Sequence, residues 1–226
     1  MSHYDVAVFS HSPNDIEELL EPFNEVVDAN SPYAEFQEDS GADMDETAGK
    51  RGYWFNPNAR YDYYSHGGRW RGMLGLKPGC EGYCSSLNRL DNGYTYEPER
   101  CDTARVRDCL FARDEEAYKR ALRRWEVLVE GAEPNDDEKD ILRIFRPEYY
   151  LTRYGDKESY AAFESAFLPY AFISADGTWH SCANMGWFGC DDGTREGMQK
   201  YKAEFEEYLK QAEKENLMIS IYDFHI

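Results

Sequence analysis

A chain of 226 residues is long enough to bury one full hydrophobic core, or one core with a large insertion. Its 44 acidic and 25 basic residues give a net charge of −19, a field that repels nucleic acid and anionic membranes, so we expect neither as a partner. No apolar run approaches the roughly 18 residues that span a bilayer, and no signal-peptide pattern opens the chain, so we expect a soluble, cytoplasmic protein.

The acidic charge is concentrated at the start of the chain. Residues 1–49 contain thirteen Asp and Glu and no Lys or Arg, and the rest of the chain carries a net charge of only −6. Such a field favours basic partners or simply solubility. Residues 28–52 combine this charge with no apolar periodicity, which predicts an acidic mobile loop or a flap that orders on binding. We expect residues 1–226 to form a single domain.

The first predicted elements are a strand and a helix. Residues 3–9 place apolar side chains at alternate positions, from Tyr4 through Val6 and Val8, which predicts a short strand. Ser12 and Pro13 then predict a helix start, with Ser12 as the N-cap and the proline in the first turn, where a missing N–H is tolerated.

Residues 53–76 are the stretch around which the rest of the chain is organised. They hold seven aromatic residues, three arginines, one histidine and a glycine pair within 24 positions. Gly67-Gly68 permits backbone conformations that other residues avoid, and it leaves room for a ligand against exposed N–H groups. Residues 69–76 alternate like a strand. Residues 78–100, rich in Gly, Asn, Ser and Tyr, are predicted to be a surface excursion.

The second half of the chain is predicted to hold three helices, a hairpin and a closing strand. One helix runs from Asp114 to residue 129, a shorter one starts near Asp156, and a long amphipathic helix covers residues 194–216. Asp176-Gly177 predicts a hairpin turn, and residues 217–226 a last strand. These elements indicate an α+β fold: a mainly antiparallel sheet with helices packed on one face, and with the N- and C-terminal strands in the same sheet.

The six cysteines allow two interpretations. Cys80, Cys84, Cys101 and Cys109 form a loose version of a zinc-binding set, but structural zinc sites use tighter spacings at both ends. Without a secretory signal, reduced thiols in the core or in loops are the favoured interpretation. We therefore expect no metal and no cofactor.

The arginines and aromatic residues of the central stretch predict a ligand-binding site. Arginine presents a planar fork that matches phosphate or carboxylate, and stacking of a base on an aromatic ring contributes about 1–3 kcal/mol. The structural alternative is a Gly–Gly bend with Trp70 in the core and Arg69 paired with an acid, because large aromatic side chains are mostly buried. The predicted ligand-binding residues are Tyr61, Tyr63, Tyr64, His66, Gly67, Gly68, Arg69, Trp70, Trp179, His180, Trp187 and His225.

Three histidines could add acid–base chemistry to this site. His66, His180 and His225 each lie near the end of a β-type run, so they could converge on one centre; the alternative is three unrelated polar residues. A histidine pair can cleave phosphodiesters, so a phosphodiesterase-like activity stays open beside simple binding, which is favoured. The sequence contains no P-loop, dinucleotide-binding or nucleophile-elbow motif, and catalytic residues are not assigned.

Several motifs resemble a family of small acidic proteins encoded by bacteriophages and prophages, to which no activity is attached. The longest is N-P-N-x-[KR]-[WY]-D-[WY]-Y-x-x-G-G-R-W at residues 56–70. The chain departs from the family at Tyr61 and Tyr63, where Trp is expected, and at Phe224, where Cys is usual. The other motifs are H-Y-x-V-x-V-F at residues 3–9, L-L-x-P-[FY]-x-E at 19–25, D-G-x-W-H at 176–180, M-G-W-[FW]-G at 185–189 and D-x-H-I at 223–226.

The resemblance implies an infected or lysogenic bacterial cell, where phage proteins of this size counter host defence or redirect host machinery. Our first hypothesis is a counter-defence protein that binds, and sequesters or cleaves, a nucleotide-derived host immune signal in the Arg/aromatic pocket. The alternative is an acidic nucleic-acid mimic that inhibits a basic host defence protein; a role in virion assembly has no supporting feature. A shared pocket for Arg69, Trp70, Trp179 and His225 favours the first, and a continuous acidic ridge the second.

Overall fold

The structure, a computed structural model, describes residues 2–85, 96–184 and 192–226. In these ranges it has five α-helices and twelve β-strands, and the strands form three mainly antiparallel sheets. The central sheet has the strand order β11-β10-β1-β12-β5, and β8 pairs with β12 beside β5. The bounds of its strands are β1 His3–Ser10, β5 Tyr63–His66, β8 Thr103–Arg105, β10 Ala171–Ile173, β11 Trp179–Ser181 and β12 Met218–His225.

The two ends of the chain form the centre of this sheet. β1 and β12 pair antiparallel over eight residues, from His3 opposite His225 to Ser10 opposite Met218. β10 adds to the other side of β1 in a parallel register. Both predictions are thus confirmed: the fold is α+β, and the N- and C-terminal strands lie in the same sheet.

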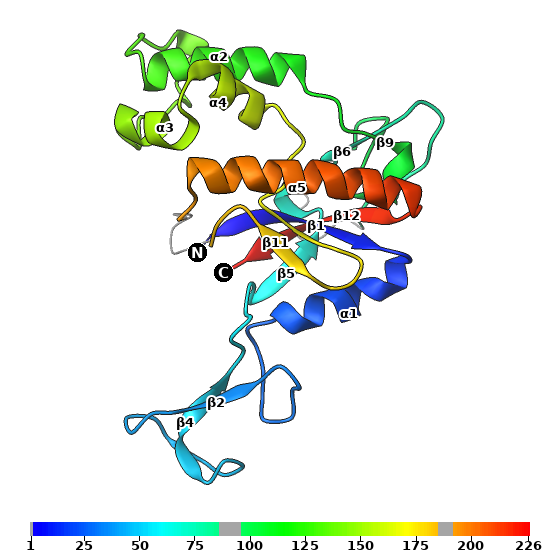
Figure 1. The fold of residues 1–226 in the computed structure, drawn as a ribbon, viewed down its shortest axis with the longest axis vertical. Helices are drawn as coiled ribbons and strands as arrows, with labels where there is room; N and C mark the ends of the chain where they lie inside the picture. The colour runs from blue at the N-terminus through cyan, green and yellow to red at the C-terminus, as the bar shows by residue number, and fades with distance from the viewer. Residues whose placement is uncertain (1, 86–95, 185–191) are drawn as a thin grey trace.

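Different helices cover the two faces of the central sheet. α5 (Arg195–Lys214) packs on one face, and the short α1 (Ile16–Leu20) packs on the other (Figure 1). α1 is flanked by two 3₁₀ turns, at Pro13–Asp15 and Glu21–Phe23. Four of the five described helices lie on the α5 side, and only α1 lies on the other.

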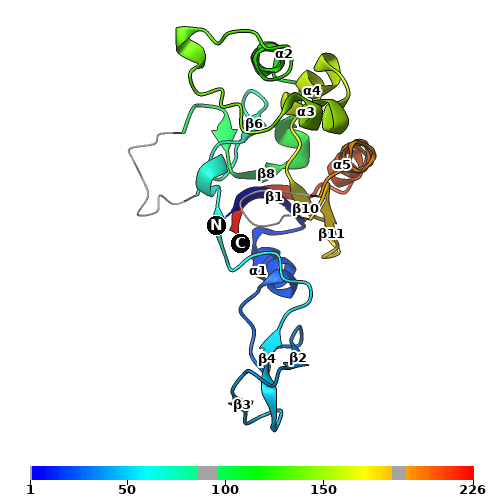
Figure 2. The same cartoon turned by 90° about the vertical axis from the view of Figure 1, so that its left-hand side faces the viewer.

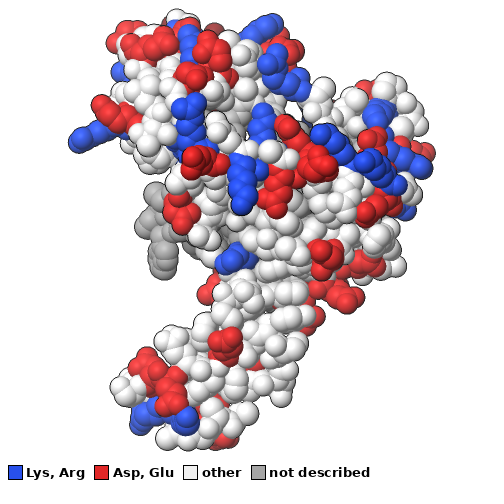
Figure 3. All heavy atoms as spheres, viewed as in Figure 1, with Lys and Arg blue, Asp and Glu red and all other residues white. Residues whose placement is uncertain are grey.

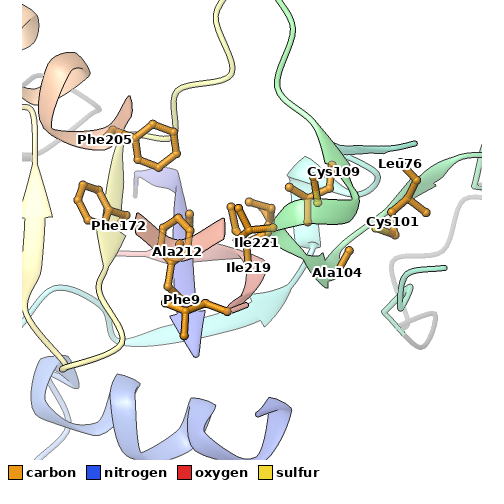
Figure 4. Close-up of a cluster of buried hydrophobic side chains, with 14 of the residues drawn as sticks. Phe9, Leu76, Cys101, Ala104, Cys109, Phe172, Phe205, Ala212, Ile219 and Ile221 are labelled. Carbon is orange, nitrogen blue, oxygen red and sulfur yellow. The ribbon is translucent and has the colours of Figure 1, made fainter. Parts of the chain in front are cut away.

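The larger core lies between α5 and the sheet and extends to a small three-stranded sheet, β7-β6-β9. Phe9, Phe172 and Phe205 pack together at its centre, and Ile219 and Ile221 continue it along β12 (Figure 4). Each such fully buried side chain contributes about 1.5–3 kcal/mol to folding. The bounds of the small sheet are β6 Leu74–Leu76, β7 Arg100–Cys101 and β9 Cys109–Leu110.

Helices α2 (Glu115–Leu128), α3 (Pro147–Tyr154) and α4 (Lys157–Glu164) form a further layer beyond α5 (Figures 1 and 2). The Asp114 carboxylate accepts the N–H groups of Glu116 and Ala117 at 2.9 Å, which confirms the predicted start of α2. No helix within the described ranges is both long enough and apolar enough to cross a membrane.

The strand predicted over residues 69–76 is wrong for most of its length. Gly68–Trp70 forms a 3₁₀ turn, and only Leu74–Leu76 is a strand. The physical reason lies in the backbone, because Gly67, Gly68 and Gly72 have φ values of 68°, 51° and 66°. Such left-handed residues interrupt an extended chain.

Residues 28–52, which lack any periodicity, nevertheless form part of a sheet. β2 (Glu35–Glu38), β3 (Met44–Asp45) and β4 (Lys50–Phe55) pair in the order β2-β4-β3 and project from the body as an arm (Figure 2). We call residues 28–55 the arm. Phe36 and Trp54 face each other across β2 and β4 with ring centroids 5.1 Å apart, a contact that no local pattern encodes. The mobility of residues 28–52 stays a prediction.

Candidate functional site

One end of the central sheet is polar. On the α5 face, β1 and β12 each carry two apolar side chains in one half and a His and an Asp in the other half, at the end where the chain begins and closes. The register sets two rows of neighbours across β5, β12 and β1: Tyr63–His225–His3 and Ser65–Asp223–Asp5. Paired strand residues point to the same face, so these six side chains form one set, which we call the polar array.

Two histidine–aspartate pairs lie side by side at the polar array. Three of their four residues belong to it, and Asp62, the residue before β5, completes the second pair. His3 Nδ1 lies 2.8 Å from Asp223 Oδ1, and His225 Nδ1 lies 2.6 Å from Asp62 Oδ1. The two imidazole rings meet edge to face with centroids 4.8 Å apart, and the Tyr63 ring stacks on His225 at 4.3 Å. A carboxylate can only accept a hydrogen bond, so it holds the proton on Nδ1 and leaves Nε2 as the free nitrogen of each ring.

The imidazole side chains of the two pairs are largely buried, whereas Asp62 and Tyr63 beside them are more exposed to solvent. The side chains of His3 and His225 are 13% and 5% exposed, whereas the Asp62 carboxylate is 38% exposed and Tyr63 51%. Within the described residues, neither Nε2 has a hydrogen-bond partner. Neither Nε2 is among the fully buried side-chain atoms that lack a hydrogen-bond partner in this part of the chain, so each keeps some contact with solvent. Titratable side chains that cluster at an accessible position mark a candidate site.

Asp5 adds a carboxyl group that titrates close to neutral pH. Burial, and to a smaller extent the charge of Asp223 directly opposite on β12, raise the pKa of Asp5 from 3.8 to about 6. The Tyr170 N–H, 3.2 Å from Asp5 Oδ1, acts in the opposite direction. The polar array thus holds a carboxyl that can carry a proton at pH values where ordinary carboxyls are charged.

Gly67 and Gly68 allow the turn that follows them to lie close to the side chains of two aspartates. A Cβ at Gly67 would lie 2.7 Å from Asp102 Oδ2, and a Cβ at Gly68 would lie 2.6 Å from Asp223 Oδ2. The backbone N–H of Arg69 donates to the same Asp223 oxygen at 3.1 Å, and that of Gly72 donates to Asp102 Oδ1 at 2.7 Å. The space that we expected for a ligand beside these glycines is filled by protein carboxylates.

The Arg69 side chain is exposed, and the Arg69 backbone lies against the polar array. Its backbone N–H and His3 Nδ1 contact the two oxygens of one carboxylate, that of Asp223. In the part of the chain that the structure describes, no carboxylate lies within ion-pair distance of its guanidinium group. The structural alternative, in which Arg69 pairs with an acid, is therefore not found there.

The predicted aromatic wall is split between the two faces of the sheet. Tyr61 is buried on the α1 face, where its hydroxyl donates to the Leu20 carbonyl, and Tyr64 stands beside it with ring centroids 5.3 Å apart. Trp179 packs on that same face against Phe224. Trp70 packs against the core on the α5 side. Trp187 lies outside the described residues. Arg69, Trp70, Trp179 and His225 therefore do not share one pocket.

The three predicted histidines do not converge. His225 belongs to the polar array, but His180 lies at the far edge of the sheet on β11, with its Nδ1 2.6 Å from Glu204 Oε1. His66 lies on the α1 face, where its Nε2 contacts Thr103 Oγ1 at 2.8 Å. Burial lowers the pKa of His66 below its usual value, which favours a neutral structural role.

The four cysteines of the loose zinc set lie in or beside the small sheet β7-β6-β9. Cys101 and Cys109 are buried, and burial raises the pKa of both thiols to about 12. Among the described residues, no group of three or more His, Cys, Asp or Glu is arranged to hold a metal ion. Of the predicted surface excursion, residues 86–95 lie outside the described ranges.

The residues missed from the sequence are His3, Asp5, Asp62 and Asp223. For His3, Asp5 and Asp223 a signal was present, because His3-x-Asp5 opens the chain and Asp223-x-His225 closes it, whereas Asp62 belongs to neither pattern. In a strand such i, i+2 pairs point to one face. The pairing of the first strand with the last, which makes the four side chains meet, is a contact across more than 200 positions.

Comparison with known proteins assigns no family to this geometry. A scan against protein-family models, a search of curated proteins and a search of solved structures each found no match. The resemblance to phage-encoded acidic proteins therefore stays an expectation. A functional proposal for this protein therefore depends on the geometry of the polar array and Arg69.

Proposed function

We propose that the protein binds a phosphorylated, nucleotide-type small molecule at the polar array and hydrolyses its phosphodiester by acid–base catalysis. In the setting that the sequence resemblance implies, this ligand is a nucleotide-derived immune signal of the bacterial host. The proposal rests above all on the two histidine–aspartate pairs, His3–Asp223 and His225–Asp62, which lie side by side next to the exposed Arg69.

The arrangement supplies the groups that phosphodiester hydrolysis needs. One imidazole, as the free base, takes a proton from water while the water oxygen attacks phosphorus; the other, protonated, gives its proton to the departing oxygen as the P–O bond breaks. The aspartates orient both rings through Nδ1, so that Nε2 is the reacting nitrogen. Such proton transfers typically contribute 10²- to 10⁴-fold each to the rate.

Two further groups fit a nucleotide ligand. The Arg69 guanidinium offers charge-assisted hydrogen bonds to phosphate oxygens, each worth about 1.5–3 kcal/mol. Tyr63 is half exposed while it stacks on His225, so it presents a free aromatic face to a base. Tyr63 also covers His225, so a phosphate reaches that ring by displacing or sliding past the tyrosine.

The test is calorimetric titration against a panel of cyclic dinucleotides and NAD-derived signals, combined with chromatography of the products. Arg69→Ala is expected to weaken binding roughly ten- to a hundred-fold, and Arg69→Lys to recover part of the loss, because an ammonium does not reproduce the fork. His3→Asn or His225→Asn is expected to slow hydrolysis by about 10²-fold or more, with a much smaller effect on binding.

His180→Asn is the matched control, since His180 also pairs with a carboxylate but lies on β11, away from the polar array. It is expected to bind and hydrolyse like the wild type. The proposal fails if no member of the panel binds, or if the Arg69 and His225 variants behave like His180→Asn. If the wild type binds a member of the panel but forms no product, the ligand-binding part of the proposal is supported and the catalytic part is refuted.

A second candidate function, inhibition of a basic host protein, is favoured by one observation. The arm projects from the body (Figures 1 and 2), and residues 28–52 contain seven acidic and two basic residues. The face seen in Figure 3, however, mixes acidic and basic side chains rather than forming a continuous acidic ridge. Neutralising the acids between Glu35 and Glu46 is expected to leave ligand affinity unchanged or slightly higher, whereas an acidic mimic would lose its inhibition.

A further inference from the structure

A groove with an apolar floor, which shares no lining residue with the polar array, lies where α5 meets the end of α4 and the segment that follows the small sheet. Its volume is about 610 Å³, within the range of small-molecule sites. Phe111 and Phe167 form part of the floor with ring centroids 5.0 Å apart, and Leu209 of α5 closes one wall. The remaining apolar lining residues are Val106, Cys109, Ala162 and Ala166.

The charged residues that line this groove are mainly basic, whereas the protein as a whole is acidic. The rim of the groove carries four basic side chains, Lys77, Arg113, Lys202 and Lys210, and two acidic ones, Glu206 and Glu213, whereas the whole chain has 25 basic and 44 acidic residues. We call it the basic groove. One wall is formed by α5, over which acidic and basic side chains are interspersed in Figure 3.

Three of the four basic side chains have a carboxylate partner. Arg113 donates from Nε and Nη2 to Glu115 Oε1, at 3.0 and 2.6 Å. Lys202 lies 3.8 Å from Glu206, and Lys210 lies 3.6 Å from Glu207; both are exposed pairs within one helix, which contribute little. The Lys77 ammonium donates to the Arg107 carbonyl, and among the described residues no carboxylate pairs with it. Within the described ranges, Lys77 is thus the lining cation without a carboxylate partner, and the other three are held in exposed pairs that the acidic group of a ligand can replace.

We propose that the basic groove binds an amphipathic organic anion, whose apolar ring or chain lies on the Phe111–Phe167 floor and whose acidic group lies against the rim lysines. Lys202, Leu209 and Lys210 share one face of α5, because they are spaced by seven and eight residues. Eight residues of helix rise about 12 Å, so one molecule with a ring system and an acidic group can contact both lysines. A nucleoside monophosphate and an acyl carboxylate share this chemistry.

The experiment uses 8-anilinonaphthalene-1-sulfonate, an aromatic monoanion that fluoresces in apolar sites, with the folded full chain. We expect one saturable site. Replacement of Lys202 and Lys210 by Ala is expected to weaken binding roughly ten- to a hundred-fold, since two charge-assisted contacts are lost. The matched control replaces Lys200 and Lys139, which do not line the groove, and so removes the same charge from the chain. Displacement of the dye by AMP or by dodecanoate identifies the source of the ligand.

Three results would overturn the proposal: equal loss in the control variant, no loss in the groove variant, or a change in oligomeric state of the groove variant, which would make the groove an interface between copies. Arg69→Ala and His225→Asn are expected to bind the dye like the wild type. Loss of dye binding in those two variants would place the probe at the polar array instead. A negative result at the basic groove therefore does not contradict the proposed function of the polar array. A negative result at the polar array likewise does not contradict the proposal for the basic groove.

Discussion

Replacement of Asp5 by Asn tests the buried carboxyl on the β1 side of the polar array. The pKa of Asp5 is raised from 3.8 to about 6 by burial first and by Asp223 second. The pKa of Asp5 is higher in the folded protein than in the unfolded chain. At pH values between the two, the folded protein therefore keeps the Asp5 proton that the unfolded chain has released. The associated stability is fully present below about pH 4 and is lost as the pH rises through about 6.

The size of the effect follows from the shift. About two pKa units correspond to roughly 3 kcal/mol of folding free energy between the low-pH and high-pH limits. Asn keeps an oxygen that can accept the Tyr170 N–H, and it removes both the buried charge and its repulsion by Asp223. Asp5→Asn is therefore expected to be more stable than the wild type at neutral pH, by up to about 3 kcal/mol, or roughly 6–10 °C in Tm for a chain of this size.

Urea-induced unfolding at several pH values measures the difference directly. Between about pH 5 and about pH 7.5, which keeps the protein above its pI of about 4.6, the advantage of Asp5→Asn is expected to grow by about 1.4 kcal/mol. Asp137→Asn, at an exposed position, is the control and is expected to show no such growth. A stability difference that stays constant with pH would refute the reasoning, because it would mean that Asp5 titrates like an ordinary carboxyl.

The remaining predictions concern the turn, a helix cap and the arm. Gly68→Ala is expected to destabilise the fold by about 3 kcal/mol or more, because the alanine would have both a left-handed φ and a steric clash. Gly49→Ala, which has a similar φ but open space around it, is expected to cost about 1 kcal/mol. Thermal unfolding measures the stability of both variants against the wild type. Asp114→Ala is expected to cost about 1 kcal/mol through loss of the α2 cap, measured by urea unfolding. Amide exchange is expected to be faster over residues 28–52 than in helix α5, and equally slow exchange would contradict arm mobility.

The sequence alone determined the elements whose signals are local. Alternating apolar positions predicted the first strand, and a short apolar run predicted the last. The helices that start after Asp114 and Asp156 and at Arg195 were predicted from caps and 3.6-residue periodicity. These patterns depend on residues within a few positions of one another, so a single sequence carries them. The α+β class followed from the order of these elements.

The tertiary structure alone decided which side chains meet. His3 and His225 lie at opposite ends of the chain and become neighbours only because β1 and β12 pair in one register; a shift by one residue would turn the polar array to the other face. The same holds for the arm, where Phe36 and Trp54 supply a contact between strands in a stretch without local periodicity. Local patterns fix which residues lie on one face of an element, but the register and packing that select a partner for that face depend on burial across the whole chain.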